Sequence, residues 1–274
     1  MNAKLERKLR TLGAIIVAGA VASVVRSVAE SRGLPFTITN RIERPFLESD
    51  RDGDDYLKES LRPHHYREFR RLKRRLADKG VLEHHVARGA HDIRTGIEAF
   101  LTLEASGWKG RRGTALVQHD GDAAFIRRAA LALAQDGDCE IISLVAGDTT
   151  VAAGIVLRHA HRAFFFKLGV DEHFARYSPG VQLTLDLTRH LCSDPAINSA
   201  DSTAGPDHPM INPIWRGRLA IGDVLIPLYR RDPVAEIIHA ALVLRRGGLA
   251  AARRTVHALR GSRKNRAATP QPQR

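Results

Sequence analysis

The stretch FARYSPGVQLTLDL, residues 174–187, carries the clearest chemical signature in the chain. An apolar extended run stops at Ser178-Pro179-Gly180, and a helical pattern starts at once. The first N–H groups of a helix have no intrahelical partner, so they bind anions such as phosphate. Gly180 has no side chain to block an anion, and Pro179 suits the first helical position. An ordinary capped helix start explains the same letters, and both interpretations stay open here.

Several carboxylates lie where proton-transfer chemistry would need them, and each also has a structural explanation. Glu104 ends a predicted helix beside the glycine-rich loop SGWKGRRG, but a solvated surface carboxylate fits as well. Asp171 follows a predicted central strand, where turn residues are common. Asp207 precedes a predicted short helix, so it or His208 could act as a cap. Asp201 is the fourth carboxylate that we consider.

Motifs for metal binding, serine hydrolysis and nucleotide binding are absent from the sequence. The sequence has no HExxH or comparable ligand spacing, no GxSxG elbow, no P-loop and no dinucleotide fingerprint. The two cysteines, Cys139 and Cys192, are far apart and sit among apolar residues. They are expected to be buried free thiols in a reducing compartment, and no metal site is expected.

The formal charge of +13 is concentrated in two segments. Residues 61–80 carry a surplus of six positive charges, residues 233–274 carry a surplus of eight, and the rest of the chain is near neutral. This distribution indicates a local anionic partner, with a solvated helix face and a basic tail as the alternative.

The predicted elements place these residues in a mixed α/β domain. A hairpin with Gly147-Asp148 at its turn and a third, apolar strand over 162–170 form the middle of the sheet. The other strands are expected at 34–42, near 81–87, near 197–202 and at 219–229. Helices are expected at 2–32, 64–79, 91–105, 121–135, 180–191, 208–215 and 234–260. The apolar run 11–25 also mimics a secretory signal, although a buried helix is the favoured interpretation.

Three strings in this arrangement resemble the FemAB/CelD-type (BioF-like) acetyltransferases of the GNAT superfamily, which often accompany cellulose or exopolysaccharide synthesis genes. They are FLTLEASGWKGRRGTAL (100–116), FKLGVDEHFARYSPGVQL (166–183) and DSTAGPDHPMINPIW (201–215). The resemblance covers about residues 34–230 and implies a mostly antiparallel sheet flanked by helices. Residues 1–82 would be a shortened N-terminal GNAT-like half, 83–232 the acyltransferase domain, and 233–274 a basic helix with a disordered tail.

The resemblance also implies a co-substrate, acetyl-CoA or another acyl-CoA, and roles for individual residues. The pyrophosphate would meet Ser178, Gly180, Val181 and Gln182, although YSPGVQ replaces the usual Gln/Arg-x-x-Gly-x-Gly/Ala string. Backbone amides around Lys167, Leu168 and Gly169 would polarise the acyl carbonyl. The predicted catalytic side chains are Glu104, Asp171 and Asp207 as bases and Tyr177 as the acid for the thiolate. The predicted acceptor contacts are Trp108, Lys109, Asp201 and His208.

The leading expectation is an acyl-CoA-dependent N- or O-acyltransferase acting on a sugar, an amino sugar or an envelope or exopolysaccharide precursor. One alternative is a Fem-like aminoacyl transferase whose basic helix 64–79 touches tRNA phosphates. Another is a non-catalytic GNAT-like module of a polysaccharide-synthesis complex. General nucleic-acid binding is not expected, because aromatic residues are scarce and no reading motif is present. A cytoplasmic location is expected, with residues 233–266 as a candidate contact with the inner membrane or a polysaccharide synthase.

Overall fold

The computed structural model divides the chain into two compact units, one of residues 42–221 and one of residues 1–41 with 222–274. It describes residues 9–48 and 50–227, together with positions 233, 237, 240, 241 and 244. The helix predicted over 234–260 and the contact predicted through 233–266 therefore lie almost entirely outside the described residues. The domain boundary predicted at residues 82 and 83 falls inside the larger unit.

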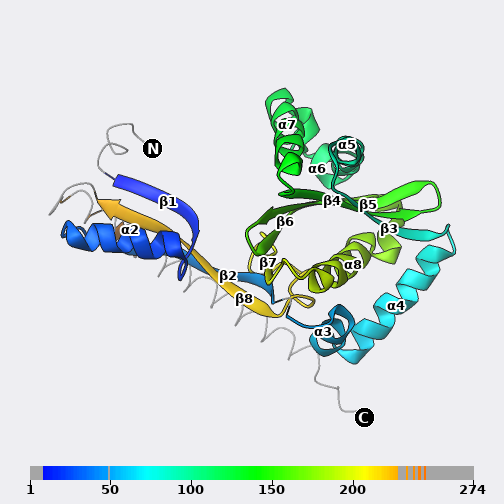
Figure 1. Ribbon diagram of the computed structural model, residues 1–274, viewed down its shortest axis with the longest axis horizontal. Coiled ribbons are helices and arrows are strands. Elements are labelled where there is room, and N and C mark those ends of the chain that lie inside the picture. Colours follow the sequence, from blue (N-terminus) through cyan, green and yellow to red (C-terminus); the bar gives the residue numbers. More distant parts are fainter. Residues whose placement is uncertain are drawn as a thin grey trace, which may run out of the picture. The chain divides into compact units, whose positions relative to one another are not determined.

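The larger unit is built around a sheet of mostly antiparallel strands (Figure 1). The strands run in the order β2-β7-β6-β5-β4-β3, and only β6 and β7 among these pairs are parallel. Their bounds are β2 (Thr37–Glu48), β3 (Leu82–Ala87), β4 (Cys139–Ala146), β5 (Thr149–His159), β6 (Arg162–Val170) and β7 (Ser199–Asp201). This arrangement confirms the predicted fold class. The β4–β5 hairpin turns at Gly147, whose φ of 59° is the left-handed value that such a turn needs.

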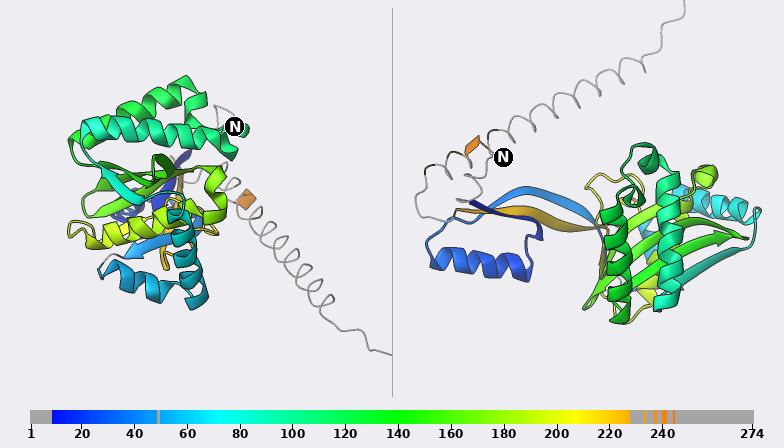
Figure 2. Two further views of the ribbon diagram at one scale, coloured as in Figure 1. Left: turned by 90° about the vertical axis from the view of Figure 1, so that its right-hand side faces the viewer. Right: turned by 90° about the horizontal axis from the view of Figure 1, so that it is seen from above.

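Helices cover both faces of this sheet (Figures 1 and 2). One face carries α5 (Ala90–Ser106), α6 (Trp108–Arg111) and α7 (Asp120–Gln135), and the other carries α3 (Gly53–Ser60), α4 (Pro63–Ala77) and α8 (Pro179–Ser193). Two apolar cores result. Ile97 and Phe100 of α5 pack with Ile141 in one core, and Leu183 of α8 packs with Trp215 in the other. Because both faces are buried, β4 and β5 read as almost continuous apolar runs.

The smaller unit shows the largest error of the sequence-based prediction. The single helix expected at 2–32 is a strand, β1 (Leu9–Ile16), followed by α2 (Ala20–Ser31), while residues 1–8 are not among those described. A turn closed by the N–H of Gly19 and the carbonyl oxygen of Ile16 separates the two elements. The β-branched run Ile15-Ile16-Val17 favours a strand, and the glycine ends it. None of the helices described is long and apolar enough to cross a membrane.

Four smaller predictions also differ from the structure. Residues 53–60, where no helix was predicted, form α3, which Asp52 caps by accepting hydrogen bonds from the N–H groups of Asp54 and Asp55. The loop SGWKGRRG contains the single turn of α6. The short helix predicted at 208–215 is a series of turns. The last strand, β8 (Gly217–Pro227), starts two residues earlier than expected.

Candidate functional site

The two parallel strands β6 and β7 part from one another in the middle of the larger unit. They pair only from Arg162 to Phe164, whereas β6 continues to Val170. On its other edge β6 has a bulge, because Ile155 of β5 lies opposite Lys167 while the next residue lies opposite Phe165. Phe166 is the extra residue, and its side chain is 39% exposed. Bulges redirect the backbone and often lie beside functional sites.

Thr203 forms hydrogen bonds at the point where the two strands separate. Its hydroxyl donates a hydrogen bond to the carbonyl oxygen of Phe165 at 2.7 Å, with the carbonyl oxygen of Phe166 at 3.2 Å. The residue has a positive φ of 49°, a conformation that β-branched residues seldom adopt. Its own N–H donates to Oδ1 of Asp201 at 2.8 Å. Thr203 was not among the predicted site residues, although it lies inside the string DSTAGPDHP.

The segment after β6 leads directly to the start of α8. A 3-10 turn, η2 (Glu172–Tyr177), ends at Ser178, which has the left-handed values φ 54° and ψ 55°. Pro179 is the first helical residue, and no side chain caps this end. The N–H groups of Gly180 and Val181 belong to the first turn, where helix geometry provides no acceptor. This set of main-chain donors suits a phosphate group, so the donors present fit the pyrophosphate of an acyl-CoA.

Gly180 packs differently from the prediction. It is buried, and a Cβ at this position would lie 3.1 Å from Leu168, 3.2 Å from Val170 and 3.3 Å from the sulfur of Met210. A side chain at 180 would therefore require these three neighbouring side chains to move by a few tenths of an ångström. The absence of a side chain lets α8 approach β6 closely, and the φ of Gly180 is not positive.

Gln182, predicted to contact the co-substrate, is fully buried between helices. Its Nε2 donates to the carbonyl oxygen of Phe69 in α4 at 3.0 Å. Its Oε1 is buried without a hydrogen-bond partner among the described residues. This side chain joins α8 to α4 and does not belong to the first-turn donors at the helix start.

Glu104 lies in a closed cluster of charges. Its side chain is fully buried, Oε1 accepts from Lys109 at 2.7 Å and from Lys167 at 3.4 Å, and Oε2 accepts from the N–H of Leu116 at 2.9 Å. Burial alone would raise the pKa of this carboxyl, but these hydrogen bonds and the two ammonium groups outweigh it and lower the pKa. The carboxylate is thus held ionised, and a proton acceptor role would need one of these contacts to open.

A second set of contacts ties the loop after β6 to α6. Glu172 accepts from the N–H of Trp108 at 2.8 Å and forms an ion pair with Arg111 at 2.7 Å. The side chain of Trp108 is left 52% exposed. Asp171, one residue earlier, accepts from the N–H of His173 at 2.9 Å and from its ring nitrogen at 2.8 Å. Glu172 therefore has a structural role, since it joins the loop after β6 to α6.

The other predicted residues have separate surroundings. Tyr177 is buried, with the Arg176 guanidinium 4.8 Å from its ring centroid. Asp201 is fully buried and forms an ion pair with Arg44. Asp207 is exposed.

His208 is half-buried, and burial lowers its pKa. Two buried atoms in this loop, Nδ1 of His208 and Oδ1 of Asn212, have no hydrogen-bond partner in the described part of the chain. The loop 205–212 therefore holds two polar atoms with unused hydrogen-bonding capacity, and its Met210 lies next to Gly180.

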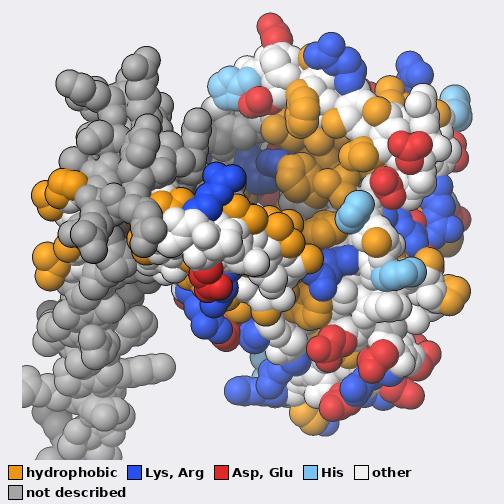
Figure 3. Space-filling model, turned by 60° about the vertical axis from the view of Figure 1, so that its left-hand side comes forward, with side chains coloured by type: hydrophobic (Ala, Val, Ile, Leu, Met, Phe, Trp, Pro, Cys, Tyr) orange, Lys and Arg blue, Asp and Glu red, His pale blue; other side chains and the backbone are white. Residues whose placement is uncertain are grey.

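The structure thus brings three predicted segments around the second half of β6. Lys167 and Gly169 lie next to Glu104 of α5. Leu168 and Met210 lie next to Gly180, at the start of α8. One face of the larger unit gathers hydrophobic side chains beside lysines, arginines and histidines (Figure 3). Among the described residues there is no cluster of side chains with the composition of a metal site.

The family model described as "Acetyltransferase (GNAT) domain" matches residues 63–208, more than half of the chain. The chain belongs to this family. It is an acyltransferase by that membership, and members use an acyl-CoA co-substrate. No curated protein matches the sequence.

Solved structures resemble this acyltransferase in fold. A conserved protein of unknown function from Bacteroides thetaiotaomicron has 11% identity and a TM-score of 0.54 over 83% of this chain and 72% of that chain. FemX has 12% identity and a TM-score of 0.52 over 86% and 76% of the two chains. The C-terminal domain of a putative lysylphosphatidylglycerol synthetase from Agrobacterium fabrum has 13% identity and a TM-score of 0.49 over 81% and 69%. At such identities the likeness concerns the fold alone.

Proposed function

We propose that this GNAT protein transfers an acyl group from an acyl-CoA, acetyl-CoA in the first instance, to an amine or hydroxyl of a sugar, an amino sugar or an envelope or exopolysaccharide precursor. The observation that carries the proposal is that β6 separates from β7 and then leads, through η2, to the uncapped start of α8. An acyl-CoA brings an activated thioester and a pyrophosphate to such a site. The N–H groups of Gly180 and Val181 would hold the pyrophosphate.

The main chain of β6 has the second role in this proposal. Beyond Phe164, β6 has no pairing with β7, and its predicted carbonyl-polarising segment, Lys167 to Gly169, lies beyond that point. A fixed N–H donor near a developing oxyanion stabilises it without reorganisation. The Thr203 hydrogen bond to Phe165 and the Glu104–Lys167 ion pair keep this segment in place.

We assign proton transfer to the carboxylates that are accessible. Asp171 lies at the end of β6, and its side chain is 20% exposed, while Asp207 is exposed on the loop 205–212. Glu104 is enclosed by Lys109 and Lys167, so we assign it to positioning those lysines. Trp108 and His208 are the proposed acceptor contacts, since one exposes its ring and the other has an unused ring nitrogen.

The test is an assay of free CoA released from acetyl-CoA by the pure protein, with N-acetylglucosamine, glucosamine and glucose as acceptors. We expect acceptor-dependent release, and loss of turnover by about 10²-fold or more in Asp171→Asn or Asp207→Asn if that carboxylate is the base. Protection of the protein by CoA in thermal unfolding checks binding separately. The proposal is contradicted if the protein does not bind CoA and releases no CoA with any of the acceptors.

A second candidate is aminoacyl transfer from aminoacyl-tRNA, favoured by the outer face of α4. Arg67, Arg70, Arg74 and Arg75 are exposed there, and they have no ion-pair partner among the residues that the structure describes. Such a face suits a phosphate backbone, and its binding would weaken steeply with salt. Retention of tRNA at 50 mM salt and its loss at about 200 mM salt, with aminoacyl transfer and no use of acetyl-CoA, would favour this candidate.

A further inference from the structure

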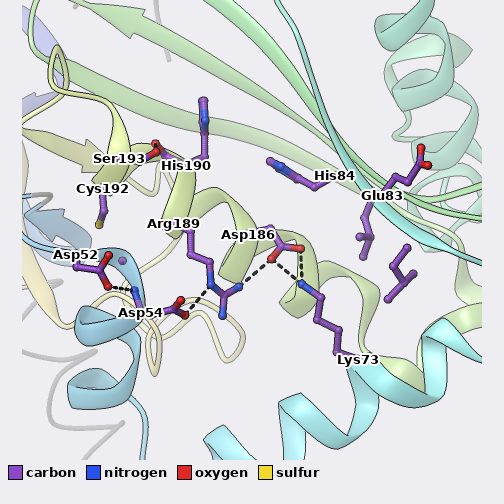
Figure 4. Close-up of a pocket in the computed structure, with 13 residues that line it drawn as sticks. Asp52, Asp54, Lys73, Glu83, His84, Asp186, Arg189, His190, Cys192 and Ser193 are labelled. Carbon is purple, nitrogen blue, oxygen red and sulfur yellow. Dashed lines mark hydrogen bonds and ion pairs between the residues drawn. The ribbon is translucent and has the colours of Figure 1, made fainter.

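A cavity of about 440 Å³ lies beside the second half of α8 in the larger unit (Figure 4). Its walls come from the start of α3, from α4, β3 and β4, and from α8 residues 186–193. Arg189 lies nine residues along the helix from Gly180, which corresponds to about 13 Å of helix rise. The cavity therefore differs from the proposed acyl-transfer site, and the inference below does not depend on that proposal.

A chain of four alternating charges crosses the cavity (Figure 4). Asp54 accepts from Nε of Arg189 at 2.8 Å, Arg189 Nη1 donates to Asp186 at 2.8 Å, and Lys73 donates to the two oxygens of Asp186 at 2.8 and 3.1 Å. The chain links α3, α8 and α4, and its two carboxylates balance its two cations. It has no charge left for a ligand to neutralise.

The remaining carboxylates of the cavity lining also have partners. Asp52 accepts the N–H groups that begin α3, as described above. Glu83 lies 3.0 Å from the ring nitrogen of His85. An anionic ligand would meet a lining with more carboxylates than lysines and arginines. A cationic ligand would find Asp54 and Asp186 already paired with Arg189 and Lys73, while Asp52 and Glu83 are exposed to solvent. Burying an unpaired charge is costly, so an anionic ligand is disfavoured, and a cation gains little from carboxylates that are solvated or already paired.

Side chains that line the cavity can, by contrast, still form further hydrogen bonds. A guanidinium has five N–H donors and an ammonium has three, and the bonds above use only part of those of Arg189 and Lys73. His84 also lines the cavity, and its Nε2 is buried with no hydrogen-bond partner among the described residues. An unpaired buried polar atom destabilises a protein, and such an atom beside a cavity indicates a missing partner.

We propose that this cavity binds a neutral polyhydroxylated molecule of about monosaccharide size. Each hydroxyl donates one hydrogen bond and accepts others, so a polyol can bond to carboxylates, to the guanidinium and to His84 without adding a charge. The volume lies within the range of small-molecule sites. The ligand would join α3 and α4 to α8 and stabilise their packing.

The first experiment is thermal unfolding and calorimetry of the full chain with single probes. Glucose, N-acetylglucosamine and myo-inositol represent neutral polyols, and inorganic phosphate and putrescine represent small molecules with a net charge. We expect saturable stabilisation by at least one polyol and none by the charged probes. Stabilisation by a charged probe alone, or by no probe, overturns the proposal.

The second experiment places the binding in this cavity. His84→Phe keeps a ring but removes the unpaired nitrogen, so the free variant should unfold at the same temperature as the parent or higher, and its polyol-induced shift should be lost. His85→Phe is the matched control, because this neighbour in β3 has a 55% exposed side chain and is absent from the lining. It should keep the shift.

His84→Leu repeats the test if the phenylalanine does not fit. Polyol binding that survives in the folded His84 variants overturns the assignment. The shift produced by CoA serves as an independent readout and should be unchanged in each variant. Loss of the polyol shift with the CoA shift intact separates this inference from the acyl-transfer proposal.

Discussion

The hydroxyl of Thr203 donates a hydrogen bond to the carbonyl oxygen of Phe165 at 2.7 Å, at the place where β7 leaves β6. A three-residue parallel strand and a single side chain thus replace the strand pairing that would otherwise continue along β6. We expect Thr203→Val to leave this carbonyl without a donor and to cost about 1 kcal/mol of unfolding free energy. It should also raise the KM for acyl-CoA. Thr203→Ser keeps the hydroxyl and should restore both values, as measured by urea unfolding and steady-state kinetics.

A side chain at position 180 should destabilise the protein directly. The added atoms of Gly180→Val would press on Leu168, Val170 and Met210, and overpacking of this kind costs about 1–3 kcal/mol. Gly180→Ala should show a smaller loss in the same direction. Thermal unfolding of the two variants without ligand is the measurement. A variant as stable as the parent would mean that α8 packs less tightly on β6 than the structure shows.

The phosphate role of the α8 start is better tested at Val181. Proline is tolerated in the first turn of a helix, and Val181→Pro removes one N–H without breaking an intrahelical hydrogen bond. Val181→Ala is the control, because it trims the side chain and keeps the N–H. We expect the proline variant to bind CoA about tenfold more weakly than the alanine variant, at a similar melting temperature. Equal affinities would remove this amide from the proposed site.

Neutralising Glu104 should mainly reduce stability. Glu104→Gln leaves Lys109 and Lys167 without their buried counter-charge, and breaking such a cluster costs about 3 kcal/mol. Glu98→Gln is the control on the same helix, since its ion pair with Arg127 is half exposed and should be worth less than about 1 kcal/mol. Chemical unfolding gives both numbers. If Glu104→Gln were fully stable but lost turnover, Glu104 would return as a candidate base.

Acid should destabilise the protein through Glu140, a buried carboxyl on β4. Burial alone would raise its pKa, but hydrogen bonds from His190 and Arg158 outweigh this and lower the pKa to about 2. The group is ionised more readily in the folded state, so its stabilisation is present above pH 4.5 and is lost as the pH falls towards 2. The loss should amount to about 3 kcal/mol at most. Unfolding measured from pH 7 to 2.5 should show this slope, and Glu140→Gln should flatten it.

The sequence alone determined the elements whose signals are local. The period-two strings and Gly147-Asp148 predicted the β4–β5 hairpin, and the apolar spacing predicted α5, α7 and α8 nearly to their ends. The break at Ser178-Pro179-Gly180 predicted where α8 begins, because helix starts depend on the few residues beside them. β1 was missed, since a short apolar run fits a helix and a strand equally well until its partners are known.

Only the tertiary structure decided what the candidate residues do. In the sequence Glu104 fits either a catalytic base or a surface carboxylate. It is buried because β6 supplies Lys167 and the segment after α6 supplies the N–H of Leu116. The partners of Thr203 and Gly180 likewise come from other segments of the chain. Burial, ion pairing and unpaired atoms such as Nε2 of His84 arise from contacts between residues far apart in the sequence. Residue types and local spacing do not specify such contacts, so these contacts are known only from the folded structure.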